Sequence, residues 1–299
     1  MDRTHVMELV RSYQVGEMSR RDFLVRASVA LGSVTLANTV LAACLPVTGP
    51  TAPVVVATLP PPTSVPQEVT PGVLAQMVSY PDGQGGTLTG YLARPAGEGP
   101  WPAVIVIQEW WGLNEHIQDV TRRLAAEGFV ALAPDLYHGQ VVSEPNEARK
   151  LVMQLDIDTA VSEIQRGVDD LLSRPQVTGE TVGVTGFCMG GGLTLMTALA
   201  EPRIGAAVPW YGQTLTATQA ARVKAPVQGH YGSLDGGIPV AAVRVMGEAL
   251  TAAGVPNEMH VYEGAQHAFF NDTRPSDNPE AAQLAWTRMV DWFRKYLKG

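Results

Sequence analysis

The sequence has 299 residues, of which 45% are hydrophobic and 17% are charged, and its formal net charge at pH 7 is −8. The length suffices for one large domain with extensions, and the composition is that of a globular protein with a substantial apolar core. The acidic balance argues against nucleic acid as a partner, because phosphate binding needs a basic surface. The two cysteines, Cys44 and Cys188, do not indicate a disulfide framework.

The first 43 residues have the organisation of an export signal. Residues 19–24 read SRRDFL, which resembles the twin-arginine motif of exported bacterial proteins. An apolar run over residues 27–43 follows; it is short for a transmembrane helix of about 20 residues and typical of a signal-peptide core. It ends in LAAC at residues 41–44, which resembles the lipobox of bacterial lipoproteins. We therefore expect a signal peptide over residues 1–43, export across the cytoplasmic membrane and a lipid on Cys44. The alternative is a helix with an incidental cysteine.

The next segment is rich in Pro, Thr and Val and carries almost no charge, with three consecutive prolines at residues 60–62. Such a composition favours extended, semi-rigid polyproline conformations. We expect residues 44–72 to be a tether and residues 73–299 to be the folded domain. The protein would then contact a membrane only through the lipid at Cys44.

Beyond residue 73, strand and helix patterns alternate along the chain. Short apolar or alternating runs predict strands at residues 75–80, 88–93, 103–108, 129–133, 181–187, 205–209, 225–229 and 258–262. Helical spacing predicts helices at residues 117–127, 147–155, 159–172, 190–200, 240–253 and 279–297. This alternation favours an α/β fold with a mostly parallel sheet that helices cover on both faces.

Cys188 lies between a predicted strand and a predicted helix, in the run Gly186-Phe187-Cys188-Met189-Gly190. This is a Gly-x-Cys-x-Gly form of the nucleophile elbow, a sharp turn that exposes one side chain at the top of a sheet. Glycines suit such a strained turn, because a Cβ would meet the neighbouring backbone. The N–H groups at a helix N-terminus favour a thiolate. The motif therefore predicts Cys188 as a catalytic nucleophile.

Asp235 and His267 each follow a later predicted strand. Nucleophile, acid and histidine in this order is the order of the α/β-hydrolase fold. Loops beyond the carboxyl ends of parallel strands converge on one crevice, so we expect the three residues to meet. His267 would take the thiol proton and Asp235 would orient the imidazole, which leads to a thioester acyl-enzyme. The backbone N–H groups of Met189 and Trp110 are the expected oxyanion hole.

Glu109 directly follows an apolar strand and precedes Trp110 and Trp111. We expect it to lie near the crevice in apolar surroundings. A carboxylate in such a place titrates at high pH and can exchange a proton with a nearby thiol.

With these residues placed, the chain resembles the dienelactone hydrolase family, the carboxymethylenebutenolidases, over about residues 73–297. The motifs that carry the resemblance are QEWWG at 108–112, APDLY at 133–137, GFCMGG at 186–191, HYG at 230–232 with Asp235, and GAQH at 264–267 with Phe269. The resemblance implies an α/β-hydrolase fold and a Cys188–His267–Asp235 triad that needs neither metal nor cofactor. It also implies a small ester or lactone as substrate.

The same resemblance implies finer roles. A glutamate at the position of Glu109 contacts the resting thiol and helps to deprotonate it when substrate binds. Tyr211 matches a tyrosine that lines the pocket, and we expect Trp111 and Phe269 to bind substrate beside it. Family members that act on an anionic dienelactone hold its carboxylate with two arginines, but this chain has Asn271 and Pro145 there. Arg149 and Arg274 are the candidates to replace them.

Two other functions fit the sequence. One is a general carboxylesterase for uncharged esters, because the two substrate-binding arginines are missing. The other is a surface-tethered binding protein that keeps the fold without turnover. The presence of Cys188, His267, Asp235 and Glu109 together favours a cysteine-dependent hydrolase of esters or lactones.

Overall fold

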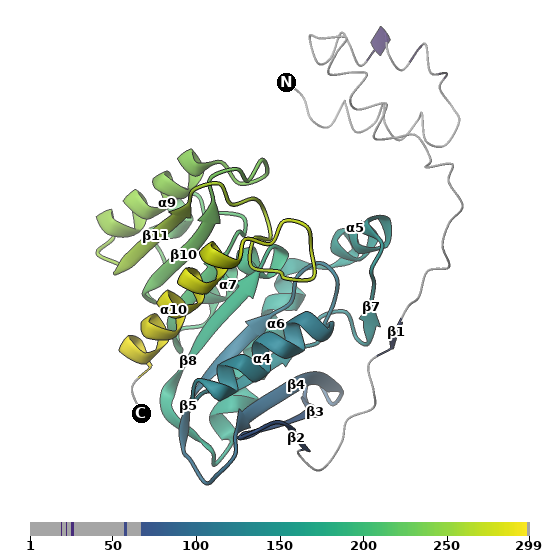
Figure 1. Cartoon of the computed structure of the whole chain (residues 1–299), viewed down its shortest axis with the longest axis vertical. Coiled ribbons are helices and arrows are strands. Elements are labelled where there is room, and N and C mark those ends of the chain that lie inside the picture. The colour runs from purple at the N-terminus through teal and green to yellow at the C-terminus, as the bar shows by residue number, and fades with distance from the viewer. Residues whose placement is uncertain (1–18, 20–21, 23–24, 27–56, 59–66, 298–299) are drawn as a thin grey trace. The chain divides into compact units, whose positions relative to one another are not determined.

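The computed structural model describes residues 19, 22, 25–26, 57–58 and 67–297 (Figure 1). The arginine pair, the apolar run and Cys44 lie outside the described residues, as does most of the predicted tether. Among the residues that are described, no helix combines the length and the apolar character that a membrane span requires.

In the described part of the chain, nine strands form one sheet in the order β11-β10-β9-β8-β5-β6-β4-β3-β2. Neighbouring strands from β11 to β6 pair in parallel, whereas β4, β3 and β2 continue the sheet in antiparallel pairing. The strands of this sheet are β2 (Gln67–Thr70), β3 (Val73–Pro81), β4 (Thr87–Pro95), β5 (Trp101–Ile107), β6 (Val130–Pro134), β8 (Val177–Phe187), β9 (Ile204–Trp210), β10 (Val227–Gly232) and β11 (Asn257–Tyr262). A separate antiparallel pair joins β1 (Ala57–Thr58) to β7 (Gln140–Val141).

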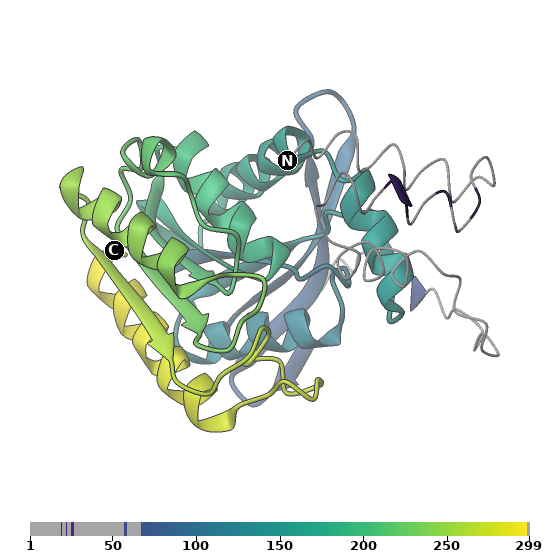
Figure 2. The same cartoon turned by 90° about the horizontal axis from the view of Figure 1, so that it is seen from above.

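Helices cover the sheet on both faces (Figure 2). They are α4 (Glu115–Ala126), α5 (Pro145–Gln154), α6 (Ile157–Ser173), α7 (Met189–Ala200), α8 (Ala217–Ala220), α9 (Val240–Ala252) and α10 (Pro279–Tyr296). Side chains of the central strand β5 alternate between the two faces. Val104 and Val106 pack in one core with α4 and α10, while Ile105 and Ile107 pack in the other with α6, α7 and α9. All four are fully buried, as expected of a parallel strand covered on both sides.

The structure confirms the predicted mostly parallel sheet and its flanking helices, and each predicted strand and helix overlaps an observed one. It differs at the end of the predicted tether, because residues 67–70 form β2 and pair with β3. The sequence QEVT has a single aliphatic residue, and the register shifts between Glu68 and Thr70. A short, irregular edge strand of this kind carries almost no period-2 signal.

The sheet order determines where the functional residues lie. Five consecutive strands of the sheet run in the same direction, in the order β11, β10, β9, β8 and β5. Each of these strands is followed, after its carboxyl end, by one candidate site residue. In chain order these residues are Glu109, Cys188, Tyr211, Asp235 and His267. Five residues that are distant in the sequence are thereby directed to one edge of the sheet.

Candidate active site

Cys188 is positioned by a sharp turn between β8 and α7. Its backbone is left-handed, with φ 56° and ψ −116°, and its N–H donates a hydrogen bond to Trp210 O at 3.0 Å. A Cβ on Gly190 would lie 2.5 Å from the carbonyl oxygens of Ile107 and Gln108, and one on Gly186 would collide with the carbonyl of Gly190. Both positions therefore require glycine, and the strain at Cys188 is held by close packing of β5, β8 and α7.

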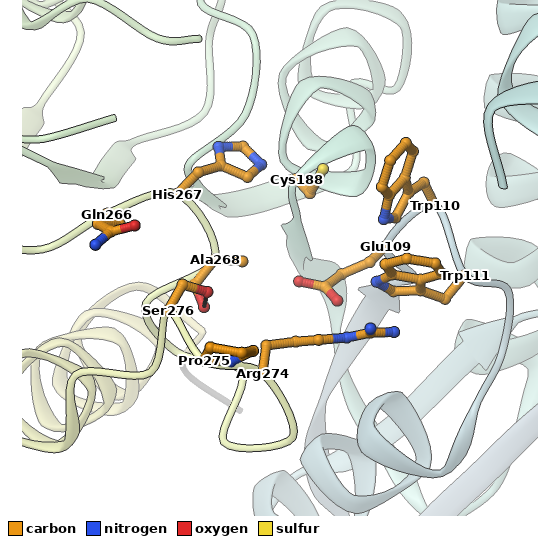
Figure 3. Close-up of a pocket in the computed structure, with 10 residues that line it drawn as sticks. All are labelled: Glu109, Trp110, Trp111, Cys188, Gln266, His267, Ala268, Arg274, Pro275 and Ser276. Carbon is orange, nitrogen blue, oxygen red and sulfur yellow. Dashed lines mark hydrogen bonds between the residues drawn. The ribbon is translucent and has the colours of Figure 1, made fainter. Parts of the chain in front are cut away.

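Asp235 and His267 form a direct ion pair, with 2.7 Å between Asp235 Oδ2 and His267 Nδ1. The other carboxylate oxygen, Oδ1, accepts hydrogen bonds from the N–H groups of Gly237 and Ile238 at 2.8 and 3.1 Å. The carboxylate is therefore fixed, and it fixes the orientation of the imidazole. The second ring nitrogen of His267 is turned toward Cys188 (Figure 3). The loops bring the predicted nucleophile, histidine and acid together.

The electrostatics of this pair favour a charged histidine. Burial disfavours imidazolium, but the hydrogen bond to Asp235 and the interaction with Cys188 raise the pKa of His267 to about 10. For Asp235, burial opposes ionisation, but His267 and the two backbone N–H groups hold the pKa of the carboxyl below its ordinary value. At neutral pH the imidazolium form is therefore available next to the sulfur of Cys188.

Glu109 lies beneath Cys188 and is almost completely buried. Its Oε2 accepts a hydrogen bond from Asn271 Nδ2 at 2.6 Å, and its Oε1 accepts one from the Tyr211 hydroxyl at 3.4 Å. Burial raises the pKa of Glu109 above its ordinary value. Four polar neighbours act in the opposite direction and lower it in part: His116, Asn271, His267 and Arg274. Among the described residues no hydrogen bond joins Glu109 to Cys188, although both line the same cavity, so the thiol contact implied by the resemblance stays a prediction.

Two backbone N–H groups beside Cys188 have no acceptor among the described residues. One belongs to Met189, the first residue of α7, and the other to Trp110, in the loop after β5. The first N–H groups of a helix have no partner within the helix. This pair is the expected oxyanion hole, and its donors are free to bind a negatively charged oxygen.

A cavity of about 660 Å³ opens beside Cys188 and His267. It is lined by Glu109, Trp110, Trp111, Cys188, Gln266, His267, Ala268, Arg274, Pro275 and Ser276 (Figure 3). The guanidinium carbon of Arg274 lies 3.8 Å from the centre of the Trp111 ring. The Nε of Arg274 is buried and has no hydrogen-bond partner among the described residues. The cavity therefore has a positive charge in its wall, stacked on an aromatic ring.

The other predicted substrate-binding residues differ in their positions. Trp111 lines the cavity. Tyr211 and Phe269 are fully buried and are not among the residues that line the cavity; the Tyr211 ring lies 5.3 Å from that of His267 and 5.4 Å from that of Phe269. Arg149 lies on α5, is exposed, contacts Asn146 at 3.5 Å and does not line the cavity.

The structure places two residues at the site whose position there the sequence did not predict. Asn271 appeared in the sequence only as the position of a missing arginine, but its amide holds Glu109. Ser276 carried no signal, because it lies in an irregular loop whose path depends on contacts with Ala268. Within the described residues no cluster of three or more His, Cys, Asp or Glu side chains could hold a metal ion.

Comparison with known proteins agrees with this geometry. The model of the dienelactone hydrolase family matches residues 88–297. The chain belongs to the dienelactone hydrolase family. It is therefore a hydrolase that acts on ester bonds, with an α/β-hydrolase fold and a small-molecule ester or lactone as substrate.

Individual relatives cover the folded domain. A protein of Methylorubrum extorquens named "Putative carboxymethylenebutenolidase" is 40% identical over 240 residues, which are 75% of this chain and 82% of that protein. The crystal structure of a "Putative Dienelactone Hydrolase" from Klebsiella pneumoniae is 37% identical with a TM-score of 0.68 and covers 75% of this chain and 99% of that one. A dienelactone hydrolase-like promiscuous phosphotriesterase from metagenomic libraries is 26% identical with a TM-score of 0.69, over 76% and 100% of the two chains.

The Asp235–His267 pair predicts a pH-dependent contribution to stability. The pKa of His267 rises from 6.5 to about 10 on folding, so this stabilisation is complete below pH 6.5 and disappears as the pH approaches 10. The pKa of Asp235 falls below 3.8, so the stabilisation is also lost in more acidic solution. We expect the difference in Tm between wild type and Asp235→Asn to be largest between about pH 4 and pH 6.5.

Circular dichroism melting at stepwise pH measures this difference. Asp291→Asn, which neutralises an exposed acid on α10, is the matched control and should leave Tm nearly unchanged at each pH. A difference for Asp235→Asn that does not vary with pH would mean that Asp235 acts through packing alone.

Proposed function

We propose that this protein is a cysteine-dependent hydrolase of esters or lactones that works through a thioester intermediate. The observation that carries the proposal is the 2.7 Å ion pair between Asp235 and His267, whose free ring nitrogen is directed toward Cys188 at a strained elbow. This geometry supports covalent catalysis with Cys188 as nucleophile, His267 as proton carrier and Asp235 as orienting acid.

In the first half of the reaction, the Cys188 thiolate attacks the carbonyl carbon of the substrate and forms a C–S bond. The carbonyl oxygen becomes negatively charged and is bound by the N–H groups of Met189 and Trp110. When the intermediate collapses, the bond to the alcohol oxygen breaks. The imidazolium of His267 donates its proton to that oxygen, which leaves an acyl thioester on Cys188 and a neutral imidazole.

In the second half, His267 accepts a proton from water, and the resulting hydroxide attacks the thioester. The C–S bond breaks, the acid is released and the thiolate is regenerated next to the imidazolium. Asp235 keeps its charge throughout and stabilises the cationic ring.

We assign thiol activation to Glu109, in a step that requires a rearrangement. Both carboxylate oxygens are bound in this structure, one by Asn271 and the other by Tyr211. Because burial already raises its pKa, Glu109 is a suitable acceptor for a thiol proton once its side chain turns toward Cys188. Substrate that enters the cavity and displaces these contacts would release it.

For the substrate charge, we propose that Arg274 replaces the missing arginines. Arg274 lines the cavity, its guanidinium carbon lies over the Trp111 ring, and its buried Nε has no partner among the described residues. A carboxylate bound there gains a charge-assisted hydrogen bond that an uncharged ester lacks. This favours anionic esters and lactones over the neutral esters of a general carboxylesterase.

The nucleophile is tested by Cys188→Ala. We expect kcat/KM for dienelactone and for 4-nitrophenyl acetate to fall at least about 10⁴-fold, because no other group can form the acyl-enzyme. Acid-quenched wild type should carry an acetyl group on Cys188 that hydroxylamine removes, as read by peptide mass spectrometry.

Cys44→Ser is the matched control, since the chain has only these two cysteines; its turnover should equal that of wild type. Turnover that survives in Cys188→Ala, or an acetyl group on another residue, would contradict the proposed nucleophile. An inert wild type on both substrates would favour the binding-protein alternative.

The role of Arg274 is tested by substituting the two candidate arginines separately. Arg274→Ala should lower kcat/KM for an anionic ester by about 10- to 100-fold relative to its neutral methyl ester, the worth of a charged hydrogen bond. Arg149→Ala, in an exposed residue outside the cavity, should leave the ratio of the two substrates unchanged. An equal loss on both esters would show that Arg274 supports Trp111 without recognising charge.

We also propose that the protein is exported and anchored outside the cytoplasmic membrane by a lipid on Cys44. The support is the order of SRRDFL, an apolar run and LAAC in residues 19–44.

In a bacterium with twin-arginine export, the full chain should label with palmitate and fractionate with membranes. Cys44→Ser should move it to the soluble exported fraction, and replacement of Arg20 and Arg21 by Lys should retain it in the cytoplasm. Membrane retention of Cys44→Ser would contradict the anchor.

A further inference from the structure

A second cavity of about 470 Å³ lies beside Cys188 and differs from the first in chemistry. Its lining residues are Trp110, Val152, Ile157, Cys188, Met189, Gly192, Leu193, Met196, Gln213, Thr214, Leu215 and Gln219. No titratable side chain apart from Cys188 is among them, whereas Glu109, His267 and Arg274 line the first cavity. Its walls come from α5, α6, α7, α8, the segment between β9 and α8, and Trp110 in the loop after β5.

The two cavities share Cys188 and Trp110. Figure 3 shows His267 on one side of Cys188 and Trp110 on the other. Residues 266–276 contribute only to the first cavity, and Met189 with its neighbours on α7 only to the second. The nucleophile therefore stands between a charged cavity and an apolar one.

The position of His267 determines which part of an ester each cavity can take. His267 must reach the oxygen of the departing alcohol to give it a proton, so the alcohol side of the ester lies on the His267 side of Cys188. The carbonyl oxygen occupies the N–H groups of Met189 and Trp110. The remaining substituent of the carbonyl carbon is the acyl chain, and only the apolar cavity remains for it.

We propose that the apolar cavity is an acyl-chain site and that the enzyme hydrolyses open-chain esters of apolar carboxylic acids. The inference rests on the proposed function and narrows it. In a small lactone the acyl and alcohol parts belong to one ring, so a second cavity of this size would have no occupant. Its volume is that of a binding pocket for a complete small ligand, for which about 300 to 1,000 Å³ is usual.

The wall of the cavity has room for substitution at Gly192. A Cβ there would make ordinary contacts, 3.6 Å from Gln213, and the backbone of Gly192 is helical. Because Gly192 and Gln213 both line the cavity, we expect a leucine at this position to occupy part of it. Ile157, another lining residue, is 43% exposed at the start of α6, where a charged side chain can also be accommodated.

The test is kcat/KM for 4-nitrophenyl esters of acetic, butyric, hexanoic and octanoic acid with the full-length enzyme. The leaving group is constant, so only the acyl chain varies. Each methylene buried in an apolar cavity is expected to raise kcat/KM up to about fourfold. We expect at least a tenfold rise from acetyl to hexanoyl, and a ratio near one in Gly192→Leu.

Ile157→Asp should also lower the hexanoyl-to-acetyl ratio, at least fivefold, because it brings a charge beside the chain. Val245→Asp is the matched control, since Val245 is an exposed apolar residue on α9, 51% exposed and outside both cavities. Its ratio should equal that of wild type. A flat or falling profile in wild type, with turnover that depends on Cys188, would overturn the acyl-chain site.

A binding measurement separates this inference from the reaction mechanism. Octanoate should bind Cys188→Ala by calorimetry at least tenfold more tightly than butyrate does, and Gly192→Leu should abolish the difference. If octanoate shows this preference but no ester is hydrolysed by wild type, the acyl-chain site stands and the proposed catalysis fails. Equal binding of the two acids would overturn the site whatever the catalytic result.

Discussion

The close approach of β5, β8 and α7 at Gly186 and Gly190 is the constraint on which the rest of the site depends. Because Gly186 and Gly190 have no Cβ, these backbones can approach closely, and the chain turns from strand to helix within a single residue, Cys188. The turn aims the sulfur out of the sheet and leaves the Met189 N–H free at the helix start. One packing contact therefore sets both the nucleophile and an oxyanion donor.

The remaining catalytic side chains do not depend on a strained backbone turn, because hydrogen bonds orient them. Asp235 is fixed by two backbone N–H groups and in turn orients His267. Glu109 is held by hydrogen bonds from Asn271 and Tyr211. The site thus contains one carboxylate that stays ionised and one that burial makes easier to protonate. Two acids with opposite pKa shifts can take different roles in one reaction.

Much of the fold and the triad followed from the sequence because they depend on local signals. Apolar runs, helical spacing and the glycines around Cys188 depend on neighbours in the chain, and the parallel sheet then brings strand ends together. The edge strand β2 was missed because its short sequence carries almost no period-2 signal, whereas its pairing with β3 depends on the tertiary structure. The sequence also could not indicate that Phe269 faces the core, that Arg149 is exposed or that Asn271 binds Glu109. Those positions depend on loop paths that hydrophobic periodicity does not encode.

The second cavity was invisible for the same reason, since its walls come from helices and a loop far apart in the chain. This separation has a consequence for the history of the family. The first cavity is lined by residues 109–111, 266–268 and 274–276, whereas the proposed acyl-chain site is lined largely by α5, α6, α7 and the segment after β9; Cys188 and Trp110 line both. Apart from these two shared residues and the catalytic Glu109 and His267, substitutions in one lining leave the other lining and the triad unchanged. Preference for one half of an ester can therefore diverge while the other half is retained, so descendants of one ancestor can acquire new substrates in small, independently selectable changes.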